Sequence, residues 1–136
     1  MLILSRYIED FDEAEFISGY AKKHKITKTE ARKRIISEEP KEKYYQEHII
    51  KAIRREFPEA LVIKLTLSMY SQAGIPDIMV IHNGRYVGIE VKRPIGSRVS
   101  ELQRRCMDAI HKAGGKAGVC RWPEEAIALI HSSEER

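Results

Sequence analysis

Apolar residues recur along the chain with two different periods, and the change between them predicts helices and strands. Apolar positions three to four residues apart predict helices over 11–25, 27–38, 41–57, 100–112 and 123–130. Shorter runs rich in Ile and Val predict strands over 61–67, 75–82, 85–92 and 116–121. Two prolines, Pro40 and Pro58, fall at breaks between these elements, as expected where a helix cannot continue.

The order of the predicted elements indicates the fold class. After residue 40 the order is αβββαβα, which predicts an α/β fold with a mixed sheet and helices packed against it. The two helices before residue 40 stand outside this pattern. We therefore divide the chain into an N-terminal helical extension, residues 1–40, and an α/β domain, residues 41–136.

A hairpin signal sets the expected register of the two central strands. Asn83-Gly84 is typical of a two-residue type I′ turn, because both turn positions need positive φ. Such a turn pairs His82 with Arg85. Counting outward from that pair places Asp77 opposite Glu90, at a close, non-hydrogen-bonded position. A bulge in either strand would give another register.

Two carboxylates that face each other across a sheet repel and destabilise it. Asp77 and Glu90 are flanked by apolar strand residues, so they need a compensating positive charge. One source of this positive charge is Lys92, which the register makes a neighbour of Asp77 on the same face. The other is a hard divalent cation, since Mg²⁺ takes one or two carboxylates. The alternative is a surface strand whose acidic residues simply pair with Lys92.

Charge alone does not decide between a nucleic-acid partner and solvated helices. The net charge is +4, and the basic residues concentrate in segments 21–34 and 92–121. Two such segments suit a polyanion. Exposed helix faces explain them equally well. The first two helices, joined near a Thr27–Glu30 capping box, also allow a helix-turn-helix interpretation.

Composition favours an intracellular protein. No apolar run reaches membrane-spanning length, and the N-terminus becomes acidic too soon for a signal peptide. We expect Cys106 and Cys120 to be reduced core residues, because their spacing matches neither a CxxC pair nor a disulfide framework. The five histidines lie in different elements without metal-ligand spacing.

The acidic residues and their neighbours form a known motif. Gly74-Ile75-Pro76-Asp77, a gap of twelve residues, and Glu90-Val91-Lys92 resemble the PD-(D/E)xK nuclease motif. Together with Glu47, Lys64 and Ser100-Glu101-Leu102-Gln103, in this order, they resemble the virus-type replication-repair nuclease (VRR-NUC) domain. The resemblance covers about residues 42–121.

The resemblance implies a restriction-endonuclease-like αβββαβ core and Mg²⁺- or Mn²⁺-dependent endonuclease activity on DNA. It implies that Asp77, Glu90 and the Val91 carbonyl bind metal, and that Lys92 orients the attacking water or stabilises the transition state. Small stand-alone members of the family occur in phages and bacteria and tend to act on branched or flapped DNA as homodimers. A cytoplasmic location, in a bacterium or a phage-infected host, follows as an expectation.

Three further positions carry two interpretations each. Glu47 either reaches the metal site, directly or through water, or pairs with Lys51 one helical turn away. Gln103 closes a capping box with Ser100, contacts the site, or does both. Lys64 binds a phosphate or buttresses the carboxylates, or is an exposed strand residue. The expected DNA-contacting residues are Lys64, Arg93, Arg98, Arg104 and Arg105.

The leading hypothesis is a structure-selective DNA endonuclease that acts on four-way junctions or flaps. A junction resolvase or a sequence-specific restriction endonuclease on the same core is a second hypothesis within the enzyme class. The main alternative is a non-catalytic DNA-binding module that uses the helices at 11–38. An assembly partner that only anchors other proteins has no sequence feature in its favour.

Overall fold

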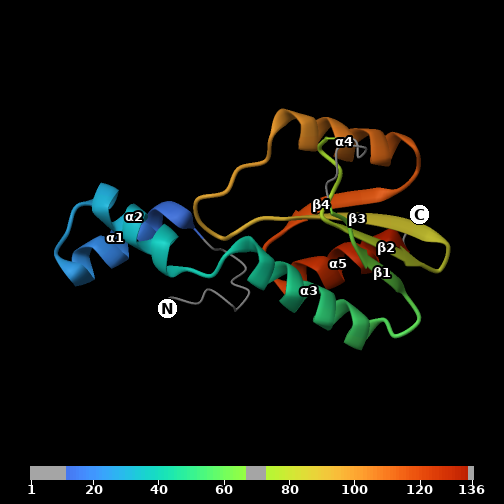
Figure 1. The fold of residues 1–136 in the computed structure, drawn as a ribbon, viewed down its shortest axis with the longest axis horizontal. Helices are drawn as coiled ribbons and strands as arrows, with labels where there is room; N and C mark the ends of the chain where they lie inside the picture. The colour runs from blue at the N-terminus through green and yellow to red at the C-terminus, as the bar shows by residue number, and fades with distance from the viewer. Residues whose placement is uncertain (1–11, 67–72, 135–136) are drawn as a thin grey trace.

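The computed structural model describes residues 12–66 and 73–134 (Figure 1). Every predicted element is present and the α/β class is confirmed. In chain order the elements are α1 (Glu13–His24), α2 (Lys28–Glu38), α3 (Glu42–Glu56), β1 (Leu61–Lys64), β2 (Ile78–His82), β3 (Arg85–Val91), α4 (Glu101–Lys112), β4 (Lys116–Cys120) and α5 (Pro123–Ser133). Within these ranges no helix has the length and apolar content needed to cross a bilayer.

All four strands are shorter than predicted, β1 and β2 by three residues each and β3 and β4 by one. β1 ends at Lys64, and β2 begins at Ile78 rather than at residue 75. Gly74 has a φ of 87°, so the chain turns before it reaches the sheet. Pro76 lacks the N–H that a strand position supplies to its ladder. The last predicted residues of the first strand include residue 67, which lies outside the described residues.

The four strands form one mixed sheet in the order β1-β2-β3-β4. The first two pairs are antiparallel, whereas β3 and β4 are parallel. A parallel pair needs a crossover connection, and α4 provides it. Figure 1 shows α4 over one face of the sheet and α3 and α5 over the other.

The main core lies between the sheet and the helices α3 and α5. Alternate residues of β3 point into it, and Val87, Ile89 and Val91 are fully buried there. Ile49 and Ile53 of α3 fill the same core. The residues between the apolar positions of β3, including Glu90, therefore face α4 instead.

A second, smaller core belongs to α1 and α2. Ile17 and Ala21 of α1 pack there with Ala31 and Ile35 of α2 and with Ile95, which comes from the loop between β3 and α4. The Thr27 hydroxyl accepts a hydrogen bond from the Glu30 N–H at 3.1 Å and caps α2, as the sequence predicted. The proposed boundary near residue 40 stays a prediction.

The loop between β3 and α4 packs against the C-terminal end of α2. The Arg93 guanidinium contacts the Glu39 carboxylate, with Nε 2.9 Å from Oε1, and donates a further hydrogen bond to the Ile36 carbonyl. At Gly96, with φ 90°, a Cβ would lie 2.9 Å from the Ile36 side chain. Both cysteines are free, as expected; Cys120 is buried and Cys106 half-buried.

Candidate active site

The hairpin has the predicted register. Asn83 and Gly84 both adopt positive φ, and His82 pairs with Arg85. The ladder continues to Ile78 opposite Ile89, so the next positions outward are Asp77 and Glu90.

Asp77 is tied to the strands on both sides of it. Its Oδ2 accepts a hydrogen bond from the Val91 N–H at 2.8 Å. Its backbone carbonyl accepts one from the Leu65 N–H at 2.8 Å. These two bonds hold the carboxylate at the start of the central strand β2, next to β3. The Val91 backbone therefore lies beside Asp77, while a role for the Val91 carbonyl stays a prediction.

Glu90 is a buried carboxylate in a crowded electrostatic environment, with only 1% of its surface exposed. Its Oε1 lies 3.4 Å from the Lys92 ammonium. Burial, and after it the charge of Asp77, raise the pKa of Glu90 to about 8, while Lys92 acts in the opposite direction. The other oxygen, Oε2, is buried and receives no hydrogen bond from any described residue.

Gln103 links the start of α4 to this carboxylate. Its side-chain Oε1 accepts from the Ser100 N–H at 2.9 Å, and its own N–H donates to the Ser100 hydroxyl at 3.1 Å. Its amide Nε2 donates to Glu90 Oε1 at 2.7 Å. The capping and site contacts predicted as alternatives therefore coexist in one side chain.

The loop before Asp77 packs tightly on α4. A Cβ at Gly74 would lie 2.5 Å from the Leu102 carbonyl oxygen, which excludes any side chain there. A Cβ at Gly88 would lie 2.9 Å from Pro76, so the bare glycine lets this proline approach the sheet. The loop and α4 enclose a hollow of about 180 Å³ lined by Leu65, Thr66, Gly74, Ile75, Pro76, Asp77, Ser100 and Gln103.

A larger hollow, about 830 Å³, lies on α1 and α2. Its lining includes the carboxylates of Glu15 and Glu38 and the basic side chains of Lys23 and Arg34. We place the reactive site at the smaller hollow, because Asp77 and Gln103 line it and both lie beside the buried carboxylate of Glu90.

Asp77, which lines this hollow, and the neighbouring Glu90 fit a divalent cation. Glu90 Oε2 lacks a donor, and Asp77 presents a second carboxylate beside it. A cation between them would offset both the repulsion and the unsatisfied oxygen. Among the described residues, no group of three or more His, Cys, Asp or Glu side chains could hold a metal ion. Two carboxylates with several waters are typical of Mg²⁺.

The structure does not bring Glu47 to this site. Its carboxylate is exposed and lies 3.9 Å from the ammonium of Lys43, not of Lys51. Glu42 faces the carboxylate pair from the first turn of α3 instead. Burial and then the charge of Asp77 raise the pKa of Glu42.

A sequence signal for Glu42 was available. Glu42, Gln46, Ile49 and Ile53 follow one another at intervals of four, three and four residues, which places them on one helix face. Gln46 is buried on that face and donates to Glu42 at 3.4 Å. Glu42 is therefore the acidic residue on the same helix face as the buried apolar residues, whereas Glu47 lies next to that face.

The basic residues expected to contact DNA divide into three groups. Lys64 is exposed and pairs with Ile78, so it points to the face opposite Asp77. Arg93 is used internally: its side chain is 15% exposed and binds Glu39, which leaves it unsuited to a DNA contact. Arg98, Arg104 and Arg105 are exposed.

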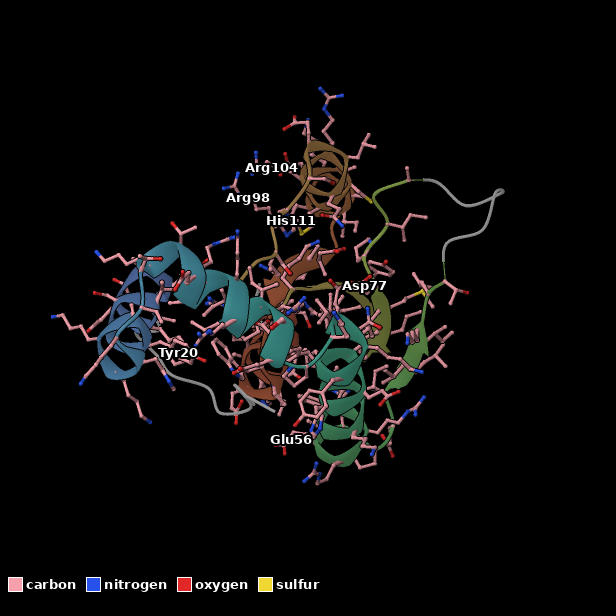
Figure 2. All side chains as sticks on the ribbon, turned by 60° about the vertical axis from the view of Figure 1, so that its left-hand side comes forward. Tyr20, Glu56, Asp77, Arg98, Arg104 and His111 are labelled. Carbon is pink, nitrogen blue, oxygen red and sulfur yellow. The ribbon has the colours of Figure 1, made fainter. Side chains whose placement is uncertain are left out.

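Two of the exposed arginines belong to the helix that carries Gln103. Arg104 and Arg105 belong to the first turns of α4, where both contact Glu101. Figure 2 shows Arg98 and Arg104 together on the side of α4 that is turned toward the N-terminal helices, with Asp77 below α4.

Comparison with known proteins identifies the fold. A family model described as the VRR-NUC domain matches residues 20–122. This match begins within α1, so it includes α2, which the sequence motifs at 42–121 did not cover. A solved structure described as a VRR_NUC domain matches with a TM-score of 0.51 and 24% sequence identity, over 64% of this chain and 95% of that one. No curated protein matches.

Proposed function

Because the chain belongs to the VRR-NUC nuclease family, we propose that it is a Mg²⁺- or Mn²⁺-dependent endonuclease that hydrolyses phosphodiester bonds in DNA. The observation that carries the proposal is the carboxylate pair. Asp77 and the buried Glu90 meet where the central strands β2 and β3 lie side by side, and Glu90 has a pKa of about 8 and an oxygen without a donor among the described residues. A carboxylate perturbed in this way is typical of functional sites, and a cation between the two groups would offset their repulsion.

Each residue of the site has a proposed role. Asp77 and Glu90 hold the cation, with the Val91 carbonyl as a further oxygen ligand. When bound, such a cation makes water easier to deprotonate and offsets charge on the phosphate. The Lys92 ammonium, 3.4 Å from Glu90, orients the attacking water or stabilises negative charge in the transition state. Gln103 holds Glu90 in place.

Asp77→Asn tests the proposal, with Glu56→Gln as a matched control. Glu56 is exposed and lies at the far end of α3 from Asp77 (Figure 2). We expect Asp77→Asn to lower the cleavage rate by on the order of a thousandfold or more, since it removes one of two cation ligands. The control should cut like the wild type, and EDTA should abolish cleavage in both active proteins.

Equal activity of Asp77→Asn and wild type would show that the site is wrongly assigned. DNA binding without turnover in either Mg²⁺ or Mn²⁺ would instead support the alternative, a non-catalytic DNA-binding module. Both measurements use the same labelled four-way junction, flap and linear duplex.

We further propose that the substrate is branched DNA, such as a four-way junction or a flap, and that the protein acts as a homodimer. The support is family membership together with symmetry, since two identical sites related by a twofold axis match a junction with paired arms. Mapping of the cuts on the three substrates tests the first part, and sedimentation velocity tests the second.

A further inference from the structure

We propose that the turn between α1 and α2 is a second DNA-contact surface, which holds the phosphate backbone of a double-stranded arm at a distance from the bond that is cut. We call this surface the basic turn, and it consists of Lys22, Lys23, Lys25, Lys28 and Lys33. The inference rests on the proposed function, because it assumes a DNA substrate.

The charges of the basic turn are exposed and largely unpaired. Segment 21–34 contains seven Lys and Arg residues against a single acidic residue, Glu30. In the described part of the chain the ion pair recorded for this segment joins Arg32 to Glu13 at 4.0 Å. A cluster of like charges without counter-charges raises its own electrostatic energy, which a polyanion would lower.

Helix stability accounts for only some of these charges. Lys22 and Lys23 lie in the last turn of α1, where the helix dipole favours a positive charge. Lys28 is the first residue of α2, where the dipole disfavours one, and the last turn of α2 has no basic residue. Stabilisation of the helix ends therefore accounts for Lys22 and Lys23 but not for Lys28, or for Lys33 in the interior of α2.

The structure also sets the position of the basic turn relative to the site. The far end of α2 is anchored by Glu39 to Arg93, the residue after Lys92. α2 has 11 residues. At about 1.5 Å per residue Lys28, at the start of α2, lies roughly 17 Å from the anchor, the length of about five base pairs of B-DNA, and Lys33 lies roughly half as far from it.

This separation favours a duplex arm as the ligand. Figure 1 shows α1 and α2 projecting from one end of the α/β domain, and Figure 2 shows Arg98 and Arg104 on the side of α4 that faces them. A stiff double helix that leaves the site along these arginines keeps its backbone within reach of the basic turn. A single strand has no such fixed course.

The first experiment neutralises the basic turn. Lys22, Lys23, Lys28 and Lys33 are changed together to Gln, in the full chain carrying Asp77→Asn so that the DNA stays intact. The matched control changes four exposed basic residues elsewhere to Gln: Lys51, Arg55, Lys112 and Lys116. Affinity for a four-way junction with arms of about 15 base pairs is measured by fluorescence anisotropy across a salt series.

We expect the basic-turn variant to bind at least about tenfold more weakly, and its slope of log K against log salt to fall by up to about 3.6 for four lost phosphate contacts. The control should stay within about twofold of its parent. Unchanged affinity and slope in a protein whose parent binds DNA would overturn the inference while leaving the proposed function intact. A parent and wild type that neither bind nor cut DNA would overturn both.

The second experiment needs no change at the basic turn. The junction arms are shortened stepwise from about 15 to about 4 base pairs, a range that includes the estimated reach. Affinity should fall when the arms no longer extend to the basic turn, and the four-residue variant should be insensitive to this shortening. An affinity that does not depend on arm length would exclude a contact with a duplex arm. An equal loss of affinity by the four-residue variant on single-stranded DNA would exclude it too.

Discussion

Glu90, in the candidate site, and Glu39, at the junction with the N-terminal helices, are two buried glutamates with similar surroundings but different roles. Glu90 and Glu39 are both almost fully buried, and each has one oxygen without a hydrogen-bond donor among the described residues. Their cationic partners are consecutive residues: Lys92 contacts Glu90 at 3.4 Å and Arg93 contacts Glu39 at 2.9 Å.

The difference between them lies in the rest of their surroundings. Glu39 faces the planar guanidinium of Arg93, which also donates to a backbone carbonyl, so this pair joins two segments. Glu90 faces a second carboxylate as well as its lysine, and the pKa of Glu90 is raised to about 8. Burial also raises the pKa of Glu39, with Arg93 opposing it. A buried carboxylate paired with Arg93 serves structure, whereas one crowded by a second carboxylate is suited to binding a cation.

Glu90→Gln should have the largest effect on activity. We expect cleavage to fall by on the order of a thousandfold or more, because a cation ligand is lost. The free energy of unfolding without metal should not fall, since the amide relieves the repulsion with Asp77 and keeps the shape of the side chain. Chemical denaturation in EDTA measures this. A clearly less stable Glu90→Gln protein would contradict the comparison.

Gln103→Ala should lower cleavage by about 10- to 100-fold, since Gln103 positions a cation ligand without binding the cation. The matched control is Ser100→Ala, which removes the hydroxyl of the cap but keeps the contact from Gln103 to Glu90. Both should cost about 1 kcal/mol of stability. Equal losses of activity would mean that Gln103 acts only through the helix cap.

Glu39→Gln should lower stability and leave cleavage almost unchanged, the opposite of what we expect for Glu90→Gln. The neutral amide leaves Arg93 without its charged partner, and we expect the free energy of unfolding to fall by about 1–3 kcal/mol. Amide hydrogen exchange should accelerate in α1 and α2 before it does in the sheet. Cleavage of substrates with short arms should stay within a few-fold of wild type. A loss as deep as that of Glu90→Gln would place Glu39 in the site.

Glu47→Gln should have the smallest effect, within about twofold in activity, because Glu47 contacts only an exposed lysine and surface pairs contribute little. Glu42→Gln, on the same helix, should change activity by about tenfold, since Glu42 shares the field of Asp77. If the two variants exchange these effects, the original prediction for Glu47 is correct.

The parts of this molecule that could be predicted from sequence depend on local rules. The Asn83-Gly84 turn requires positive φ at two positions, and that requirement alone sets the register that brings Asp77 to Glu90. The contact between Gln103 and Ser100 spans three residues and follows from helix capping. The mixed sheet could be predicted because the order of helices and strands follows from the local hydrophobic pattern of each segment.

The parts that could not be predicted depend on contacts between distant segments. Arg93 and Glu39 are 54 positions apart, and no local pattern says that this arginine turns inward to a helix end. In the sequence Arg93 looked like one more basic residue near the site. Lys64 was placed on the correct strand, but its use depends on which face of the sheet the DNA approaches.

The absence of a side chain at Gly74 has a mechanical consequence. The Leu102 backbone lies so close to Gly74 that no side chain fits there, and Gln103 donates a hydrogen bond to Glu90. The loop that carries Asp77 and the first turn of α4 are therefore in direct contact. Arg104 is the next residue of that turn. We therefore expect any displacement of this turn to move Asp77 and Glu90 together, so that a DNA contact at Arg104 would also act on the position of both carboxylates.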